Sequence, residues 1–288
     1  MSTCDICYEL YDTEQLQNHL LTCMEQQIKK MKQIDDKHNA DKLILTDTQQ
    51  KALHYANKKA KIYTKNMHLL VLARLQMNNY TENDLNAVIS YMQTKMPIII
   101  HVRLDNDKIK IIYNDTHYRN TFEIFKNKPI ETNPRVQWEN TLFGKIYGLV
   151  DGVERVKYGA LNLTNDPNGL KSCLGYGDSY FVLKNKVKER ISFVQGDSCG
   201  QQLHIATFKH FEHILYYYSD KLLDDIIKVA TGKSSHTIDS EPLYTELQVH
   251  GPVRLDTDIE KVVINRRHKK DQNIIKILKE RNIPYQWM

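Results

Sequence analysis

The chain has 288 residues, of which 26% are charged and 41% are hydrophobic, and its formal net charge is +5. This composition is typical of a folded globular protein and excludes a largely disordered chain, and so mild a charge selects no partner by itself. The longest apolar run, Met96–Val102, is far shorter than the ~20 residues that cross a bilayer, so we expect no membrane contact. Five cysteines and no secretory signal at the N-terminus predict an intracellular protein, cytoplasmic or nuclear.

Three of the five cysteines fall within the first 23 residues, in a pattern typical of a zinc site. Cys4 and Cys7 are separated by two residues, whereas His19 and Cys23 are four apart, which places them on one face of a helix. The spacing therefore predicts one tetrahedral zinc ion held by these four side chains. Because so short a unit has almost no core, the metal would supply most of its folding free energy.

The four zinc-binding candidates resemble those of the ubiquitin-binding zinc fingers of postreplication-repair ligases, which share the Cys-x2-Cys-x11-His-x3-Cys spacing. The resemblance covers residues 3–27 and implies a finger domain, residues 1–27, that recruits a protein partner such as ubiquitin. Small fingers of this spacing also bind nucleic acid or other proteins, so these partners stay open as alternatives.

Residues 28–44 are polar with helical periodicity and are interpreted as a helical linker. Beyond it, residues 45–288 mix helical and strand-like segments. Strands separated by long helical insertions predict an α+β domain with a mainly antiparallel sheet rather than a regular βαβ repeat.

Three helices are expected at the start of this domain, over residues 46–62, Met67–Leu75 and Thr81–Lys95. Thr46 and Thr81 have the side-chain types that cap helix N-termini. We assign Lys58–Lys59 to a solvated helix surface. The residues expected to face inward on the first helix are Leu53, Ala56, Ala60 and Ile62.

Runs of β-branched and aromatic residues predict the strands. The stretch around Ser179–Leu183 and Arg190–Val194 also contains glycine turns, which favour either a β-hairpin or a sheet that presents a cleft. A helical region around Phe208–Leu215 follows, and a helix over Asp271–Arg281 precedes the apolar ending Tyr285–Trp287. The other expected strands are Ile98–Leu104 and Ile109–Tyr113, paired as a hairpin, with Thr245–His250 and Lys261–Ile264 later in the chain.

From Leu45 onward the chain resembles an uncharacterised, mostly bacterial domain family of unknown function, which implies a fold but no activity. The residues that carry the resemblance are Thr48–Leu53, Tyr158–Leu163, Asp166–Gly169, Phe193, Gly196–Ser198, Glu246–Leu255 and Asp258–Glu260.

A second similarity is to the ADP-ribosyltransferases, which use a His or Arg on a first strand, a Tyr after a glycine turn, and a late Glu. This chain offers His101 or Arg103, then Tyr180 after Gly175-x-Gly177, then Glu246. The resemblance implies NAD as cofactor and Glu246, Tyr180 and Gln248 as catalytic residues. The cofactor-binding residues that it implies are His101, Arg103, Ser179 and Tyr180.

Two classes of function follow from these patterns. One is an NAD-dependent ADP-ribosyltransferase whose finger chooses the target. The other is a non-catalytic adaptor that binds ubiquitin or nucleic acid through the finger, with a role in the DNA damage response. The basic run Arg266–Lys270 is a further candidate for phosphate contact, or the solvated start of the last helix.

Overall fold

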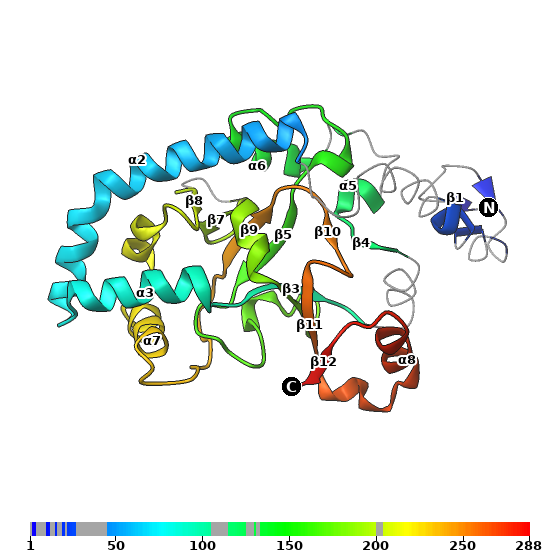
Figure 1. Cartoon of the computed structure of the whole chain (residues 1–288). Helices are drawn as coiled ribbons and strands as arrows, with labels where there is room; N and C mark the ends of the chain where they lie inside the picture. Colours follow the sequence, from blue (N-terminus) through cyan, green and yellow to red (C-terminus); the bar gives the residue numbers. More distant parts are fainter. Residues whose placement is uncertain are drawn as a thin grey trace.

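A mainly antiparallel sheet forms the centre of the large domain in this computed structural model (Figure 1). Its strand order is β12-β11-β6-β3-β5-β9-β7-β8, and the parallel pair among them is β11 with β12. The predicted α+β class is therefore confirmed. The strands are β3 (Ile98–Val102), β5 (Lys157–Leu161), β6 (Ser179–Leu183), β7 (Ile191–Gln195), β8 (Ala206–Thr207), β9 (Thr245–Val249), β11 (Ile259–Ile264) and β12 (Tyr285–Trp287).

Short strands β4 (His117–Tyr118) and β10 (Val253–Arg254) form a separate antiparallel pair. The helices are α2 (Asp47–Met77), α3 (Glu82–Thr94), α5 (Thr121–Ile124), α6 (Pro134–Phe143), α7 (Asp220–Ala230) and α8 (Gln272–Glu280), with 3-10 helices η2 (Gly152–Glu154), η3 (Lys171–Cys173), η4 (Asn185–Arg190), η5 (Glu212–Tyr217) and η6 (Arg266–Lys270). The structure describes residues 2–3, 10–11, 15, 19–20, 22–26, 45–104, 115–124, 130, 133–199 and 204–288.

Helix α2 begins where its capping residue predicts. The Thr46 hydroxyl accepts a hydrogen bond from the Gln49 backbone N–H, and the Gln49 side chain accepts one from the Thr46 N–H, forming a capping box. The predicted break between Ile62 and Met67 is wrong, because α2 continues without interruption for 31 residues. Ile62 is 47% exposed, so its predicted inward position is also wrong.

Contacts with η5 account for the continuity of α2 through this stretch. The Thr64 hydroxyl lies 2.9 Å from Nδ1 of His213, and Nδ1 of His68 lies 2.9 Å from a carboxylate oxygen of Glu212. Tertiary partners of this kind override weak local helix propensity. The predicted helix around Phe208–Leu215 is corrected to a turn after β8 followed by η5, a 3-10 helix.

Strands β6 and β7 do not form the expected hairpin. Three strands, β3, β5 and β9, lie between them in the sheet. Local pattern identified both strands correctly, but their pairing is set by segments far away in the sequence. The other expected hairpin, between Ile98–Leu104 and Ile109–Tyr113, falls partly outside the described residues.

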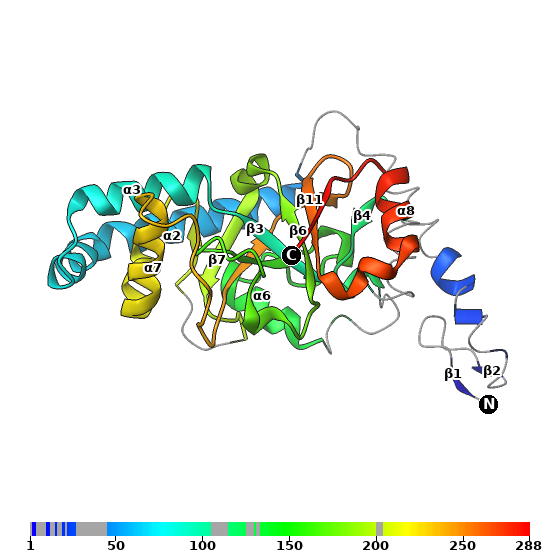
Figure 2. The same ribbon diagram turned by 90° about the horizontal axis from the view of Figure 1, so that it is seen from below.

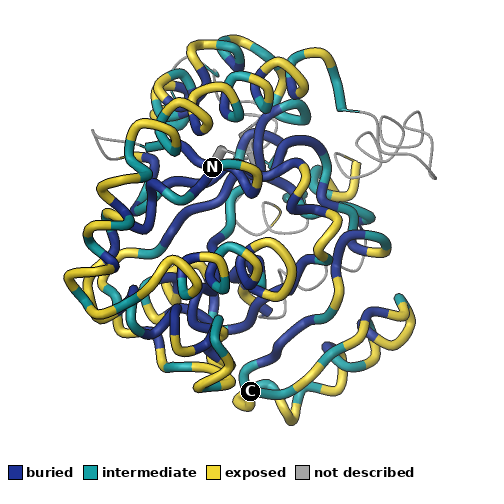
Figure 3. The backbone as a smooth tube through the Cα atoms, turned by 60° about the vertical axis from the view of Figure 1, so that its left-hand side comes forward, coloured by how far each residue is buried: buried dark blue, intermediate teal, exposed yellow. Residues whose placement is uncertain are grey.

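Helices cover both faces of the sheet. One face packs against apolar side chains of α3, α7 and α8, and the other packs against the first half of α2 and α6. Figure 2 shows α3 and α7 together at one end of the sheet and α8 at the other. In Figure 3 the central strands are drawn as buried while the helices alternate between buried and exposed positions, as expected for amphipathic elements around one core.

A cluster of four buried charges ties the segment around α5 to β5. Arg119 Nη2 lies 2.8 Å from a carboxylate oxygen of Asp115, and Arg119 Nη1 lies 3.1 Å from Glu123. The second Glu123 oxygen lies 3.1 Å from Nζ of Lys157, and each of these side chains is at most 3% exposed. Two positive and two negative charges therefore balance one another in the interior.

At the N-terminus the structure describes short pieces only, with strands β1 (Ser2–Thr3) and β2 (Leu10–Tyr11) and helical residues at 19–20 and 22–26. The predicted linker, residues 28–44, lies outside the described residues, as do Cys4 and Cys7. None of the helices that the structure describes is long and apolar enough to cross a membrane.

Candidate active site

Four of the residues implied by the transferase resemblance lie on one face of the sheet. His101 pairs with Tyr180 across β3 and β6. Two residues before His101, Ile99 pairs with Ala160 of β5, which in turn pairs with Glu246 of β9. Because side chains alternate between faces along a strand, this register puts all of them, and Gln248, on the same side. One strand, β5, still lies between β3, which carries His101, and β9, which carries Glu246.

His101 and Tyr180 form a buried pair that contacts the loop after β5. Their ring centroids are 5.6 Å apart. Nδ1 of His101 donates to the Gly177 carbonyl over 2.8 Å, and Nε2 accepts the Leu170 N–H over 3.1 Å. Burial lowers the pKa of His101, so the ring is neutral with its proton on Nδ1. The Tyr180 hydroxyl donates to the Pro167 carbonyl over 2.9 Å.

Gly169 lies directly against this pair, with a positive φ of 73°. A Cβ there would lie 2.9 Å from both His101 Nε2 and Tyr180 Cδ1. We therefore expect Gly169→Ala to lower the free energy of unfolding by about 1–3 kcal/mol through backbone strain and crowding. Urea unfolding measures it. Gly175→Ala is the matched control, because nothing lies within 4 Å of a Cβ at Gly175, and its change should stay within ~0.5 kcal/mol. Equal stability of both variants would contradict the tight packing described for Gly169.

The two remaining candidates of this set lie elsewhere. Arg103 is exposed, and its Nη2 donates to the Gly175 carbonyl over 2.7 Å. Ser179 pairs with Val102, so it points to the opposite face from Tyr180, where its hydroxyl accepts the Asn265 N–H over 3.1 Å. The structure therefore does not bring these two side chains together with the other four.

The carboxyl group of Glu246 is buried on this face and has a shifted pKa. Glu246 is 4% exposed, and burial raises the pKa of its carboxyl to about 7, against the ordinary value of 4.5. Nε2 of Gln248 donates to it over 2.9 Å, and this hydrogen bond favours the ionised form, which burial opposes. No ion pair within the described part of the chain involves Glu246. A carboxyl in this state can accept or donate a proton near neutral pH.

A chain of buried hydrogen bonds fixes the orientation of Gln248. The Ser192 hydroxyl donates to Oε1 of Gln248 over 3.0 Å and lies 3.1 Å from Nε2 of His250. The Ser192 hydroxyl has one proton, which it gives to Gln248, so the proton of its hydrogen bond with His250 must lie on Nε2 of His250. Nδ1 of His250 is then unprotonated and accepts from the Tyr147 hydroxyl over 2.8 Å. Burial lowers the pKa of His250 to about 3, which agrees with this neutral form. The amide NH₂ of Gln248 therefore always faces Glu246.

Sequence reasoning missed three polar neighbours of Glu246. The Tyr244 hydroxyl donates to Oδ2 of Asp197 over 3.1 Å, and the Tyr176 hydroxyl lies 3.1 Å from that of Tyr244. The two tyrosine rings meet edge to face at 6.2 Å, and Tyr176 is 52% exposed. Burial raises the pKa of the Tyr244 hydroxyl, and the hydrogen bond with Tyr176 and the negative charges of Glu246 and Asp197 raise it further. The sequence spacing could have identified Tyr244, because it precedes Glu246 by two residues and so shares its face of the strand.

Two of the four predicted zinc ligands are described. Sγ of Cys23 and Nε2 of His19 are 3.0 Å apart, and both side chains are half-buried. Two ligands of one tetrahedral zinc ion lie roughly 3.5 Å apart, given ~2.3 Å Zn–S and ~2.1 Å Zn–N bonds, so these two atoms would hold one ion after moving apart by about 0.5 Å. Elsewhere in the described ranges, no group of three or more His, Cys, Asp or Glu side chains is placed to hold a metal ion.

Comparison with known proteins gives one match. Residues 102–225 match the model of a family described as "Protein of unknown function (DUF3626)". No match was found among curated proteins. The matched segment contains β5, β6 and β7 with the blocks Tyr158–Leu163 and Gly196–Ser198 that carry the expected resemblance, whereas β9 with Glu246 lies beyond it. Between residues 102 and 225 the chain is thus similar to a family of unknown function.

Proposed function

We propose that the large domain binds NAD and transfers or removes ADP-ribose, with Glu246 as the catalytic carboxylate. One observation supports this proposal above the others: a buried carboxyl without a basic partner among the described residues, held by Gln248, on the face that also carries His101 and Tyr180. The buried glutamates Glu123 and Glu139 are instead paired with cations. An unpaired buried charge destabilises a fold, so its presence favours a chemical role.

In the proposed reaction the bond between the ribose C1 and the nicotinamide nitrogen breaks, and nicotinamide leaves with the electron pair. Positive charge then develops on the ribose, and an ionised Glu246 stabilises it electrostatically, an effect of about 3–4 kcal/mol in preorganised sites. The acceptor bonds to C1 and releases a proton, which the same carboxylate accepts. The fixed amide of Gln248 orients the acceptor or the ribose beside it.

Within this proposal the exposed aromatic surface belongs to Tyr176 rather than to Tyr180. Tyr180 is 3% exposed and covered by Gly169, whereas Tyr176 is 52% exposed and linked through Tyr244 to Asp197 near Glu246. A pyridinium ring carries positive charge, which favours stacking on an aromatic face and a nearby carboxylate. His101 and Tyr180 would then fix the loop beside the site.

Titration calorimetry with NAD and chromatographic measurement of nicotinamide release test the proposal. We expect binding, with release that rises as the pH passes about 7, because the reaction needs the ionised form of a carboxyl whose pKa is raised to about 7. A full-length protein that neither binds NAD nor releases nicotinamide with water or any protein acceptor would overturn it. The alternative, a non-catalytic adaptor, would then be preferred.

We also propose that Cys4, Cys7, His19 and Cys23 bind one zinc ion and that this finger recruits a protein, with ubiquitin or a nucleic acid as the candidates. The 3.0 Å approach of His19 and Cys23 supports the zinc site. Zinc thiolates need a reducing compartment, so we place the protein inside the cell, in the cytoplasm or nucleus. Separate titrations of the full-length protein with labelled ubiquitin and with duplex DNA, with and without zinc, would identify the partner.

Native mass spectrometry of the full-length chain is expected to show one bound zinc ion that a chelator removes. Cys7→Ser should lose the metal, because three remaining ligands hold it far less tightly. Cys199→Ser is the matched control: Cys199 is exposed and distant in sequence, so that variant should keep full zinc content. An unchanged mass after chelation, or a Cys7→Ser protein with full metal content, would rule out this ligand set.

A further inference from the structure

Helix α2 carries a row of exposed lysines along its outer surface. Lys51, Lys58 and Lys65 follow one another at seven-residue intervals, and Lys61 lies between the last two. Each seven-residue step turns only ~20° around a helix and advances ~10.5 Å, so these side chains stay on one side over roughly 21 Å. We call Lys51, Lys58, Lys61 and Lys65 the α2 lysine stripe.

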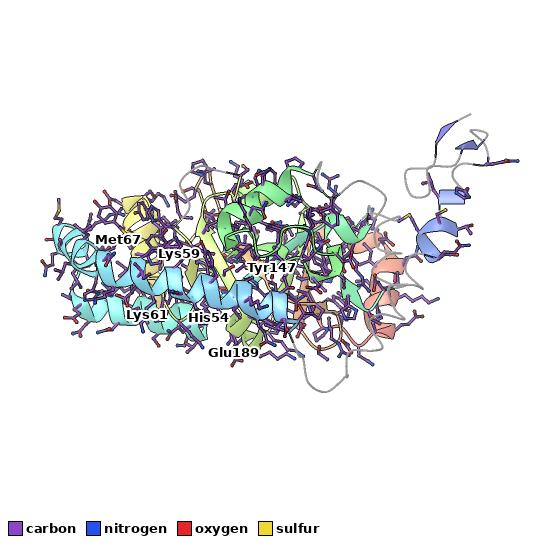
Figure 4. The ribbon with its side chains drawn as sticks, turned by 90° about the horizontal axis from the view of Figure 1, so that it is seen from above. His54, Lys59, Lys61, Met67, Tyr147 and Glu189 are labelled. Carbon is purple, nitrogen blue, oxygen red and sulfur yellow. The ribbon has the colours of Figure 1, made fainter. Side chains whose placement is uncertain are left out.

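The packing of α2 fixes the direction in which the stripe faces. Ala52, Ala56 and Ala60 are fully buried, and Ala52 and Ala56 belong to the apolar cluster that includes Phe143 of α6. All four stripe residues are exposed. In Figure 4, which looks down on α2, His54 and Lys61 lie along this outer surface. The small alanine side chains hold the helix close to the domain, so the stripe cannot rotate inward.

No acidic side chain of the described residues forms an ion pair with the stripe. No Asp or Glu occurs between Asp47 and Glu82, so the helix offers no partner beyond its first residue. The other helices differ: on α7 Lys221 pairs with Asp225 and Lys228 with Asp224, and on α8 Lys276 pairs with Glu280.

We infer that the α2 lysine stripe binds the sugar-phosphate backbone of duplex nucleic acid, without reading its sequence. Duplex nucleic acid carries about one negative charge per 1.7 Å of its axis, so a row of lysines roughly 21 Å long can face several phosphates of both strands at once. Lysine ammonium groups neutralise phosphates as point charges and release condensed counterions, which provides the affinity. The stripe contains none of the residues proposed for the NAD site or for the zinc site.

A lipid surface fits the stripe less well. Peripheral membrane helices insert a row of large apolar side chains next to their basic face. Of the exposed large hydrophobic residues of α2, Ile62 falls within the length of the stripe, whereas Leu69, Leu70 and Met77 come after its last lysine. Charge without an accompanying apolar row favours phosphates in solution over a bilayer.

Fluorescence anisotropy with a labelled 20-base-pair duplex tests the inference on the full-length, zinc-loaded protein at several salt concentrations. The variant Lys51→Gln/Lys58→Gln/Lys65→Gln should bind at least about tenfold more weakly at low salt. The slope of log affinity against log salt should fall by about 1 per lysine, or about 3 in total. Two duplexes of unrelated sequence should bind equally well.

The control variant Lys95→Gln/Lys145→Gln/Lys233→Gln removes the same charge from exposed sites outside α2. It should keep nearly the wild-type affinity and slope, and circular dichroism should show both variants folded. Equal loss in the two variants would mean that net charge alone acts, and no loss in either would mean that other residues bind; both overturn the inference. Binding of the wild type to anionic phosphatidylserine vesicles but not to duplex would overturn it in favour of a membrane.

Discussion

Replacing Glu246 with glutamine is expected to reduce nicotinamide release by about 10²–10³-fold and, at the same time, to stabilise the folded domain above pH 7. The loss of activity corresponds to the ~3–4 kcal/mol that a preorganised charge contributes to a transition state. The gain in stability follows because glutamine occupies the same buried space without an ionisable group.

The sign of the stability effect comes from the raised pKa. The folded protein holds a proton on Glu246 up to about pH 7, whereas the unfolded chain releases it near pH 4.5. Between these values the folded state binds more protons, so wild-type stability falls as pH rises from about 4.5 to about 7 and stays low above it. Glu246→Gln lacks this loss. Its advantage should be absent below pH 4.5 and reach about 3 kcal/mol at pH 8.

Urea unfolding at pH 4 and pH 8, together with the release assay, measures both effects. Glu260→Gln is a suitable control, because Glu260 is exposed on β11 and its replacement should change neither property. A Glu246→Gln protein with full activity would remove Glu246 from the proposed mechanism. If it were instead less stable than the wild type at pH 8, the carboxylate would be a structural group.

The largest loss of stability is expected from Glu123→Gln, at about 3–5 kcal/mol. Glu123 balances Arg119 and Lys157 in the interior, where each of these side chains is at most 3% exposed. Without its charge, the cluster keeps two cations against Asp115 alone, and an uncompensated buried charge is costly. The variant should unfold at a much lower urea concentration with an unchanged m-value.

Glu280→Gln provides the comparison for this prediction. Glu280 also pairs with a lysine, Lys276, but that pair is 3.8 Å long and largely exposed, so its removal should change stability by less than about 0.5 kcal/mol. A similar, small effect at both positions would show that the buried cluster is compensated by solvent or by structural relaxation.

Local patterns in the sequence predicted most elements but not their arrangement. Ser179–Leu183, Thr245–Val249 and Ile259–Ile264 are strands because runs of β-branched and aromatic side chains determine them locally. The continuity of α2 could not be predicted from its own residues, since Thr64 and His68 lie where α2 gains support from η5. Strand order depends on contacts between distant segments, which no local pattern contains.

In the candidate site, too, local spacing predicts some positions while others depend on contacts between distant segments. Glu246 and Gln248 could be placed on one face from their two-residue spacing, and His101 opposite Tyr180 follows once β3 and β6 are paired. Ser179 is the neighbour of Tyr180 on β6, so its side chain points to the opposite face and does not lie beside the other cofactor-binding candidates. Tyr176 comes from a different loop, so its approach to Tyr244 depends on tertiary packing.

The position of β9 has a consequence for the order in which the chain can fold. Strands β5 and β7 are both made long before β9, yet β9 lies between them and hydrogen-bonds to both. An incomplete chain that ends before Thr245 therefore leaves two central strands with unpaired edges, which promote association between chains. Because β11 must also be present to cover β6, completion of the sheet has to wait during synthesis until nearly the whole polypeptide has been made.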